Sequence, residues 1–162
     1  MPENPWGRKT MQQEKILQIW DSAFEGITFS LDKNIDPCQI LQLYDHVSWL
    51  DGNETEETVK KMFLNSYAVA SAYDKETGKL IGFFRALSDG VGDAYMVDLL
   101  VHPSYRKKGI GKALVKLLST FLKEQGITWI VCIGVPGTEK FYCDCGGKVM
   151  ADHIPLRFFG EE

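Results

Sequence analysis

Apolar residues near the start of the chain recur with the period of a helix. They fall at i, i+3, i+4, i+7 and i+8, at Ile16, Ile19, Trp20, Ala23 and Phe24. This spacing predicts an amphipathic helix, and Gly26 is a typical stop signal behind it. The polar stretch 1–10 is expected to be a loose arm, and residues 27–31 a short strand.

Two further helices are predicted from their start signals. Asp36 followed by Pro37 suits an N-cap and a first helical turn, and Gln39 would complete a capping box. Asn53 and Glu56 have the same spacing, so a second helix is expected to begin near Asn53.

The pattern then changes to short apolar runs separated by polar turns. Residues 67–73, 80–87 and 94–101 form three such runs, with turn residues at 74–78 and 88–90. Short strands joined by tight polar turns are typical of an antiparallel meander.

The C-terminal half contains the clearest helical pattern of the chain, over residues 109–125. A buried strand is expected at 127–133, and a strand–helix–strand crossover implies that it pairs in parallel with the strand before the helix. A short helix is predicted at 138–145 and a last strand at 148–159. The fold class is therefore α+β, with a mostly antiparallel sheet.

Length and charge narrow the functional classes. A chain of 162 residues fits one domain, and a net charge of −4 argues against nucleic acid as a partner. No apolar run approaches the ~20 residues of a membrane helix, so no membrane partner is expected. Without a signal-like N-terminus, the expected compartment is the cytoplasm, with reduced thiols. Cys143 and Cys145 are too close for a usual zinc pair, and no metal is expected.

The segment 101–112 carries the most specific chemistry, because it lies between a strand and the best-defined helix. A helix start offers unpaired N–H groups, and Gly109 and Gly111 would let an anion approach them closely. Positive charge is added by Arg106, Lys107, Lys108 and Lys112. The pattern predicts a diphosphate site, although the residues alone also fit an ordinary helix start with a solvated basic patch.

Residues 95–114 resemble the acetyl-CoA-binding motif of the GNAT N-acetyltransferase superfamily. An apolar strand precedes Val101-x-Pro103-x-Tyr105, and Arg106-x-x-Gly109-x-Gly111 opens a helix. A second segment, Phe141-Tyr142-x-x-x-Gly146, is similar to another motif of the family, although Gly147 stands where phenylalanine is usual. Residues 86–90 are more loosely similar to aralkylamine acetyltransferase-like members.

The resemblance implies a GNAT-like sheet flanked by helices, in which a splayed central strand holds acetyl-CoA. A GNAT domain is expected over residues 27–162, preceded by an arm and an extra helix over 1–26. The implied cofactor-binding residues are Leu99, Leu100, Val101, Arg106, Lys107, Lys108, Gly109, Ile110, Gly111 and Lys112. The backbone N–H near Leu100 would polarise the thioester carbonyl.

The resemblance also implies the catalytic roles. Tyr142 would protonate the leaving thiolate as a general acid. Asp98, the one charged residue among 95–101, would take a proton from the substrate ammonium or orient it, but a solvent-facing carboxylate is an equal alternative. Trp49 is expected on the acceptor wall, with a core position as its alternative.

The predicted activity is acetyl transfer from acetyl-CoA to a primary amine, by direct attack through a tetrahedral intermediate. A small, aromatic or apolar amine is the expected acceptor. The alternatives are a protein acetyltransferase acting on lysines or N-termini, and a non-catalytic acyl-CoA-binding module. The N-terminal apolar stripe fits either burial against the chain's own sheet or a contact between two subunits, and Phe158 with Phe159 fit burial in a partner. A homodimer is therefore among the expected states.

Overall fold

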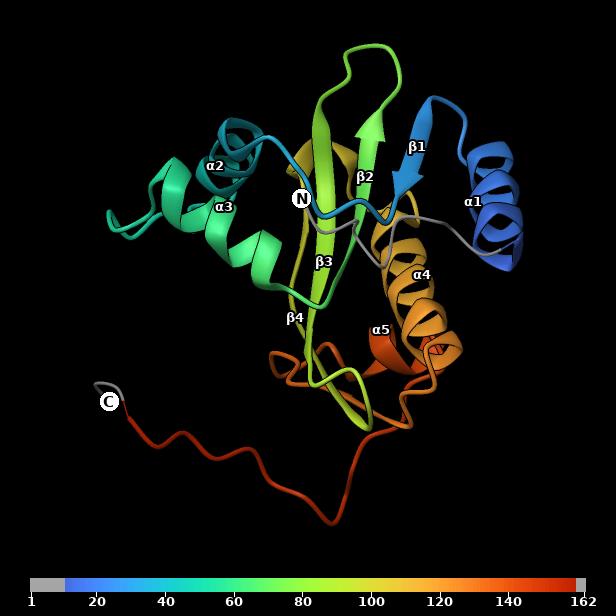
Figure 1. Cartoon of the computed structure of the whole chain (residues 1–162), viewed down its shortest axis with the longest axis vertical. Helices are drawn as coiled ribbons and strands as arrows, with labels where there is room; N and C mark the ends of the chain where they lie inside the picture. The colour runs from blue at the N-terminus through green and yellow to red at the C-terminus, as the bar shows by residue number, and fades with distance from the viewer. Residues whose placement is uncertain (1–10, 160–162) are drawn as a thin grey trace.

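A computed structural model describes residues 11–159 and contains one five-stranded sheet with the order β1-β2-β3-β4-β5 (Figure 1). The strands are β1 Ile27–Ser30, β2 Ala68–Asp74, β3 Leu80–Ser88, β4 Asp93–Val101 and β5 Trp129–Cys132. Neighbouring strands pair antiparallel except β4 and β5, which pair in parallel. The predicted α+β class, the meander and the parallel crossover are therefore confirmed.

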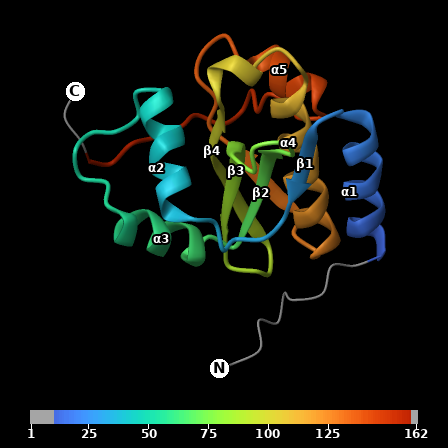
Figure 2. The same cartoon turned by 90° about the horizontal axis from the view of Figure 1, so that it is seen from above.

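Helices cover both faces of the sheet (Figure 2). They are α1 Met11–Ala23, α2 Pro37–His46, α3 Glu56–Asn65, α4 Ile110–Glu124 and α5 Glu139–Asp144, with a short 3₁₀ helix, η1, at Pro103–Tyr105. On one face α4 buries Leu114 and Leu118 completely, and on the other α2 and α3 bury Ile40 and Phe63 against Phe83. The sheet is thus held between two apolar layers.

The start of α2 confirms one prediction and corrects another. The Asp36 carboxylate accepts a hydrogen bond from the backbone N–H of Cys38 at 2.9 Å, as an N-cap does. The capping box with Gln39 is wrong, because the Gln39 amide oxygen instead accepts from the N–H of Leu80 at 2.6 Å. A contact between distant segments has replaced the local one.

The start of α3 lies later than predicted. Thr55 is its N-cap, and Thr55 and Thr58 form the capping box through each other's backbone N–H groups. The pairing of Asn53 with Glu56 is therefore wrong. Asn53 lies in the preceding loop, where its N–H donates to Asp51 at 2.9 Å.

The predicted C-terminal strand at 148–159 is wrong. These residues form turns and loop, and all of them are exposed. β5 is also shorter than the predicted 127–133. A strand is stable only when an adjacent strand satisfies its backbone groups. In the described chain β5 pairs with β4 alone, so the alternating apolar pattern after α5 finds no sheet partner.

The first helix is confirmed, and it packs on the adjacent sheet edge. The rings of Trp20 and Phe24 lie 5.8 Å and 5.3 Å from the ring of Phe29 on β1, both edge-on. The predicted arm at 1–10 and the side chains of Ile16 and Ile19 lie outside what the structure describes. The division into residues 1–26 and 27–162 stays a prediction.

Candidate functional site

The loop after β4 forms a turn suited to binding an anion. Lys107 and Gly109 both adopt the left-handed conformation, with φ of 61° and 84°. Gly109 is the N-cap of α4 and supplies no side-chain hydrogen bond, so the first N–H groups of α4 meet no capping side chain. A Cβ added at Gly111 would lie 3.4 Å from the Phe141 ring, which means that little space beyond the glycine separates α4 from α5. The left-handed turn and the uncapped N–H groups fit a phosphate group, whereas the missing side chain of Gly111 makes room for Phe141 of α5.

The predicted basic residues around this loop have different surroundings. The Lys108 ammonium lies 5.2 Å from the centre of the Tyr105 ring, and the Arg106 Nε donates to the last carbonyl of β4 at 3.0 Å. Lys112 instead pairs with Asp144 of α5 at 2.9 Å. Lys112 thus connects α4 to α5, whereas Arg106 and Lys108 surround the loop itself.

β4 and β5 separate halfway along β4. Their pairing runs from Asp93 opposite Trp129 to Met96 opposite Cys132 and extends no further within the described residues. Beyond this point β4 continues to Val101 beside an edge that β5 does not occupy. The predicted cofactor-contacting residues of β4, Leu99, Leu100 and Val101, all lie on this free half.

A bulge in β4 lies where the two strands separate. Phe83 of β3 faces Leu100, but Arg85 faces Val97, so two residues of β4 lie opposite one residue of β3. Asp98 occupies this bulge with φ of 60°, a conformation that is costly for most residues and tolerated by aspartate and asparagine.

Arg85 fixes the bulge through a partly buried ion pair that sequence reasoning missed. Its Nε and one terminal nitrogen reach the same oxygen of Asp98, Oδ2, at 2.7 Å and 2.6 Å. The Arg85 and Asp98 side chains are 11% and 27% exposed. Arg85 is the lone charge of β3, and Asp98 is the lone charge in the apolar part of β4 after Asp93; this shared feature on neighbouring strands could have revealed the pair.

Aromatic rings extend from the bulge toward α2. The Tyr44 ring lies 5.9 Å from Phe83 and 6.0 Å from Trp49, which is 45% exposed. Burial raises the pKa of the Tyr44 hydroxyl, and the nearby Asp98 carboxylate raises it further. Tyr44 therefore links the half-exposed Trp49 to the bulge on the α2 face of the sheet.

Tyr142 lies on α5, close to the end of β5. A Cβ added at Gly134 would come within 3.2 Å of its ring. Burial raises the pKa of the Tyr142 hydroxyl, and the nearby thiols of Cys132 and Cys145 and the hydroxyl of Tyr95 contribute in the same direction. Like an ordinary tyrosine hydroxyl, this phenol is protonated at neutral pH, and the raised pKa extends that range upward.

Tyr95 connects the two predicted catalytic residues. Burial raises the pKa of its hydroxyl, and the Asp98 carboxylate and Cys132 add to that shift. Tyr95 thus interacts electrostatically with Asp98, and also with Tyr142. Tyr95, which lies on β4 just before its separation from β5, is therefore within electrostatic range of both Asp98 and Tyr142.

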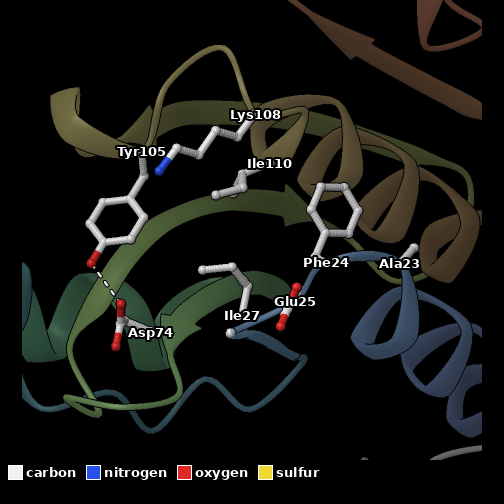
Figure 3. Close-up of a pocket in the computed structure, with 9 residues that line it drawn as sticks. Ala23, Phe24, Glu25, Ile27, Asp74, Tyr105, Lys108 and Ile110 are labelled. Atoms are coloured by element: carbon white, nitrogen blue, oxygen red, sulfur yellow. Dashed lines mark hydrogen bonds between the residues drawn. The ribbon is translucent and has the colours of Figure 1, made fainter.

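An open pocket of about 390 Å³ lies on the other side of the loop (Figure 3). It is bounded by the end of α1, the start of β1 and the loop before α4, and in it the Tyr105 hydroxyl donates to Asp74 at 2.7 Å. Lys108 and Ile110, two of the predicted cofactor-binding residues, also line this pocket, so it adjoins the loop before α4.

Over residues 11–159, no three His, Cys, Asp or Glu side chains are grouped so that they could hold a metal ion. In the same part of the chain, no helix has the length and apolar character needed to cross a membrane.

The split sheet and the open helix start define a GNAT-type α+β protein. The profile of the Acetyltransferase (GNAT) family matches residues 35–146, and the chain belongs to this family. GNAT acetyltransferases use acetyl-CoA, which confirms the expected cosubstrate. The roles of the individual site residues stay predictions.

Relatives differ in their named activity. The chain is 32% identical over 125 residues to an uncharacterized N-acetyltransferase ycf52 of Pyropia yezoensis, covering 76% of this chain and 71% of the relative. It is 31% identical over 148 residues to histone acetyltransferase TAP1 of Glycine max, covering 86% of this chain and 63% of the relative.

The fold also matches solved structures. Glucosamine-6-phosphate N-acetyltransferase from Arabidopsis thaliana superimposes with a TM-score of 0.66 at 16% identity. The superposition covers 83% of this chain and 100% of the Arabidopsis chain. A probable acetyltransferase from Staphylococcus aureus gives a TM-score of 0.69 at 19% identity, with 83% and 99% covered. At such identities the likeness shows the fold alone.

Proposed function

We propose that this chain transfers the acetyl group of acetyl-CoA to a small primary amine with an aromatic or apolar substituent. The observation that carries the proposal is the meeting of three features at the separation of β4 and β5. These are a helix start without a capping side chain, suited to an anion, a half-buried tyrosine from α5, and an acid with aromatic rings on the α2 face.

The chain's own residues would hold the cosubstrate along β4 and α4. The N–H groups at the start of α4, with Arg106 and Lys108, would bind its diphosphate. The free half of β4, around Leu99 to Val101, would pair with the pantetheine arm through backbone groups. A backbone N–H near Leu100 would stabilise negative charge developing on the carbonyl oxygen. Acetyl-CoA supplies the activated acetyl group as a thioester.

Tyr142 is proposed as the general acid. Its hydroxyl, like that of an ordinary tyrosine, is protonated at neutral pH, and burial raises its pKa further. A protonated phenol near the separation of β4 and β5 can donate its proton to a thiolate as that thiolate leaves. Half-burial of the ring in the contact between α5 and β5 would keep the hydroxyl in position.

Asp98 is proposed to orient the acceptor ammonium. Both hydrogen bonds from Arg85 go to Oδ2, and no hydrogen bond to Oδ1 occurs within the described residues. Oδ1 can therefore accept a hydrogen bond from an ammonium group. Trp49 and Tyr44, on the same face, would contact the apolar part of the amine.

A protein acceptor is the second candidate, because one relative is named a histone acetyltransferase. The half-exposed Trp49 favours a small apolar amine over a lysine side chain. The cytoplasm remains the predicted compartment, and a relative named a chloroplastic acetyltransferase makes the plastid the alternative.

The test measures free CoA released with a panel of aralkyl, alkyl and polyamine acceptors and with lysine peptides. We expect aralkylamines to give the highest kcat/KM. Tyr142→Phe should lower kcat by roughly 10²–10⁴-fold without weakening acetyl-CoA binding. Tyr73→Phe, the same change at a half-buried tyrosine of β2, is the control and should have no effect. Turnover of peptides alone would indicate a protein acceptor. No turnover with any acceptor would refute the proposal that this chain is an enzyme.

A further inference from the structure

Phe24, which directly follows α1, packs against the loop that begins α4. A Cβ added at Gly109, the N-cap of α4, would lie 3.4 Å and 3.5 Å from two carbons of the Phe24 ring. Among residues 11–159, and apart from the chain neighbours of Gly109, no other residue comes within 4 Å of this position. Figure 3 shows the ring between the end of α1 and the first turn of α4, where it lines the same pocket as Ile110. An aromatic ring thus supports the loop at the residue where the helix starts.

Phe24 is itself held in place by the edge strand of the sheet. Its ring lies edge-on to the Phe29 ring of β1, with 5.3 Å between the ring centres. The Asp21 carboxylate fixes the end of α1 to the same strand, because it accepts from the N–H of Phe29 at 3.2 Å and from the Thr28 hydroxyl at 3.3 Å. The Phe24 ring therefore joins Gly109 to β1.

Gly109 has little to hold its conformation by itself. Its φ of 84° lies in the left-handed region, and glycine loses more conformational freedom on ordering than any other residue. Lys107, two residues earlier, is left-handed as well, and no side chain caps the start of α4. The contact with Phe24 supplies a restraint that this part of the loop would otherwise lack.

The support comes from outside the part of the chain that matches the family. The match begins at residue 35, whereas α1 and Phe24 precede it. The loop before α4 lies within the match. A segment outside the matched part therefore reaches the loop at which the diphosphate of acetyl-CoA is proposed to bind.

We propose that Phe24 is a positioning residue for acetyl-CoA, an inference that rests on the proposed cofactor site. By packing against Gly109, the ring would hold the loop in the conformation whose N–H groups bind the diphosphate. Less freedom is then lost when acetyl-CoA binds, so the affinity is higher. The diphosphate is separated from the thioester by the pantetheine arm, so Phe24 acts on cofactor binding and not on acetyl transfer.

The test compares the Kd of acetyl-CoA, measured by calorimetry, for the unchanged chain and for Phe24→Ala. We expect the variant to bind about 5–30-fold more weakly, the factor equivalent to the free energy of ordering one residue. In turnover, KM for acetyl-CoA should rise while kcat at saturating acetyl-CoA stays unchanged. Phe24→Leu keeps apolar bulk against Gly109 and should restore most of the affinity.

Trp20→Ala is the matched control. Trp20 also packs edge-on against the Phe29 ring, at 5.8 Å, so this variant removes a comparable contact of α1 but leaves the one to Gly109. It should bind acetyl-CoA as the unchanged chain does. Hydrogen exchange of the amides of residues 107–111 should be faster in Phe24→Ala than in Trp20→Ala.

The outcomes separate this inference from the proposed function. Equal Kd values for the unchanged chain and Phe24→Ala, or equal weakening in Trp20→Ala, would overturn the role of Phe24 and leave the acetyl-CoA site intact. No binding by the unchanged chain would refute the site, and the role of Phe24 with it.

Discussion

Removal of the Arg85 guanidinium tests whether the ion pair holds the β4 bulge. Arg85→Met keeps the length of the side chain but loses two short charge-assisted contacts to Asp98. Such bonds contribute about 1.5–3 kcal/mol each. Because the Asp98 side chain is 27% exposed, water can replace part of this loss, and we expect a cost of about 2–3 kcal/mol.

Asp98→Asn tests the same pair from the other side. Asparagine tolerates the left-handed φ of 60°, so this variant changes the charge and not the backbone. It leaves the Arg85 charge, 11% exposed, without its counter-ion. Because this charge is the more buried of the two, we expect a larger cost, about 3–5 kcal/mol.

The assay is urea unfolding followed by circular dichroism for the unchanged chain, both single variants and the double variant. The double variant should cost less than the sum of the two single variants, because neither unpaired charge then remains. In thermal unfolding, each kcal/mol corresponds to roughly 2–4 °C for a chain of this size. Additive losses, or a loss below about 1 kcal/mol for Asp98→Asn, would refute the reasoning.

Three further predictions concern pH and packing. Because burial raises the pKa of Tyr142, activity that depends on its proton should persist through pH 10 and fall only above it. A pH–rate profile that falls on the basic side with a midpoint below the ordinary phenol pKa of about 10 would contradict this role. Burial, with the nearby His46, lowers the pKa of His102, whose Nδ1 accepts from the Ser104 N–H at 3.1 Å. The contribution of His102 to the free energy of unfolding should therefore be complete above the unfolded-state pKa of about 6.5 and decrease as the pH falls through 6.5 toward the lower folded-state pKa. His102→Asn should make the free energy of unfolding less dependent on pH in this range, and an equally steep loss in the variant would contradict the prediction. Gly82→Ala would place a Cβ 2.9 Å from the Leu100 carbonyl oxygen, so about 1–3 kcal/mol of stability should be lost in urea unfolding, whereas an unchanged midpoint would show that β3 and β4 can move apart.

Local signals in the sequence were sufficient for much of the fold. The N-cap at Asp36, the glycine at the start of α4 and the spacing of the α4 apolar stripe depend on residues within one or two turns, and each is found as predicted. The motif at 101–112 could likewise be recognised in the sequence, because a strand, a glycine turn and a helix follow one another along the chain.

Contacts between distant segments account for the errors. Gln39 bonds to Leu80, and Arg85 pairs with Asp98 across two strands, which no local pattern specifies. Residues 148–159 have the alternation of a strand, but a strand also needs an edge to pair with, and alternation alone does not specify one. The neighbourhood of Tyr142, Tyr95 and Asp98 likewise depends on how β4 and β5 separate.

Calorimetric titration with acetyl-CoA tests the central claim, the cofactor site at the start of α4, most directly. The unchanged chain should bind, and Gly111→Glu should abolish binding, because it adds negative charge in the first turn of α4 and bulk against the Phe141 ring. Gln125→Glu adds the same charge at the far end of α4 and should bind as the unchanged chain does. Absence of binding by the unchanged chain, or equal binding by Gly111→Glu, would contradict the account.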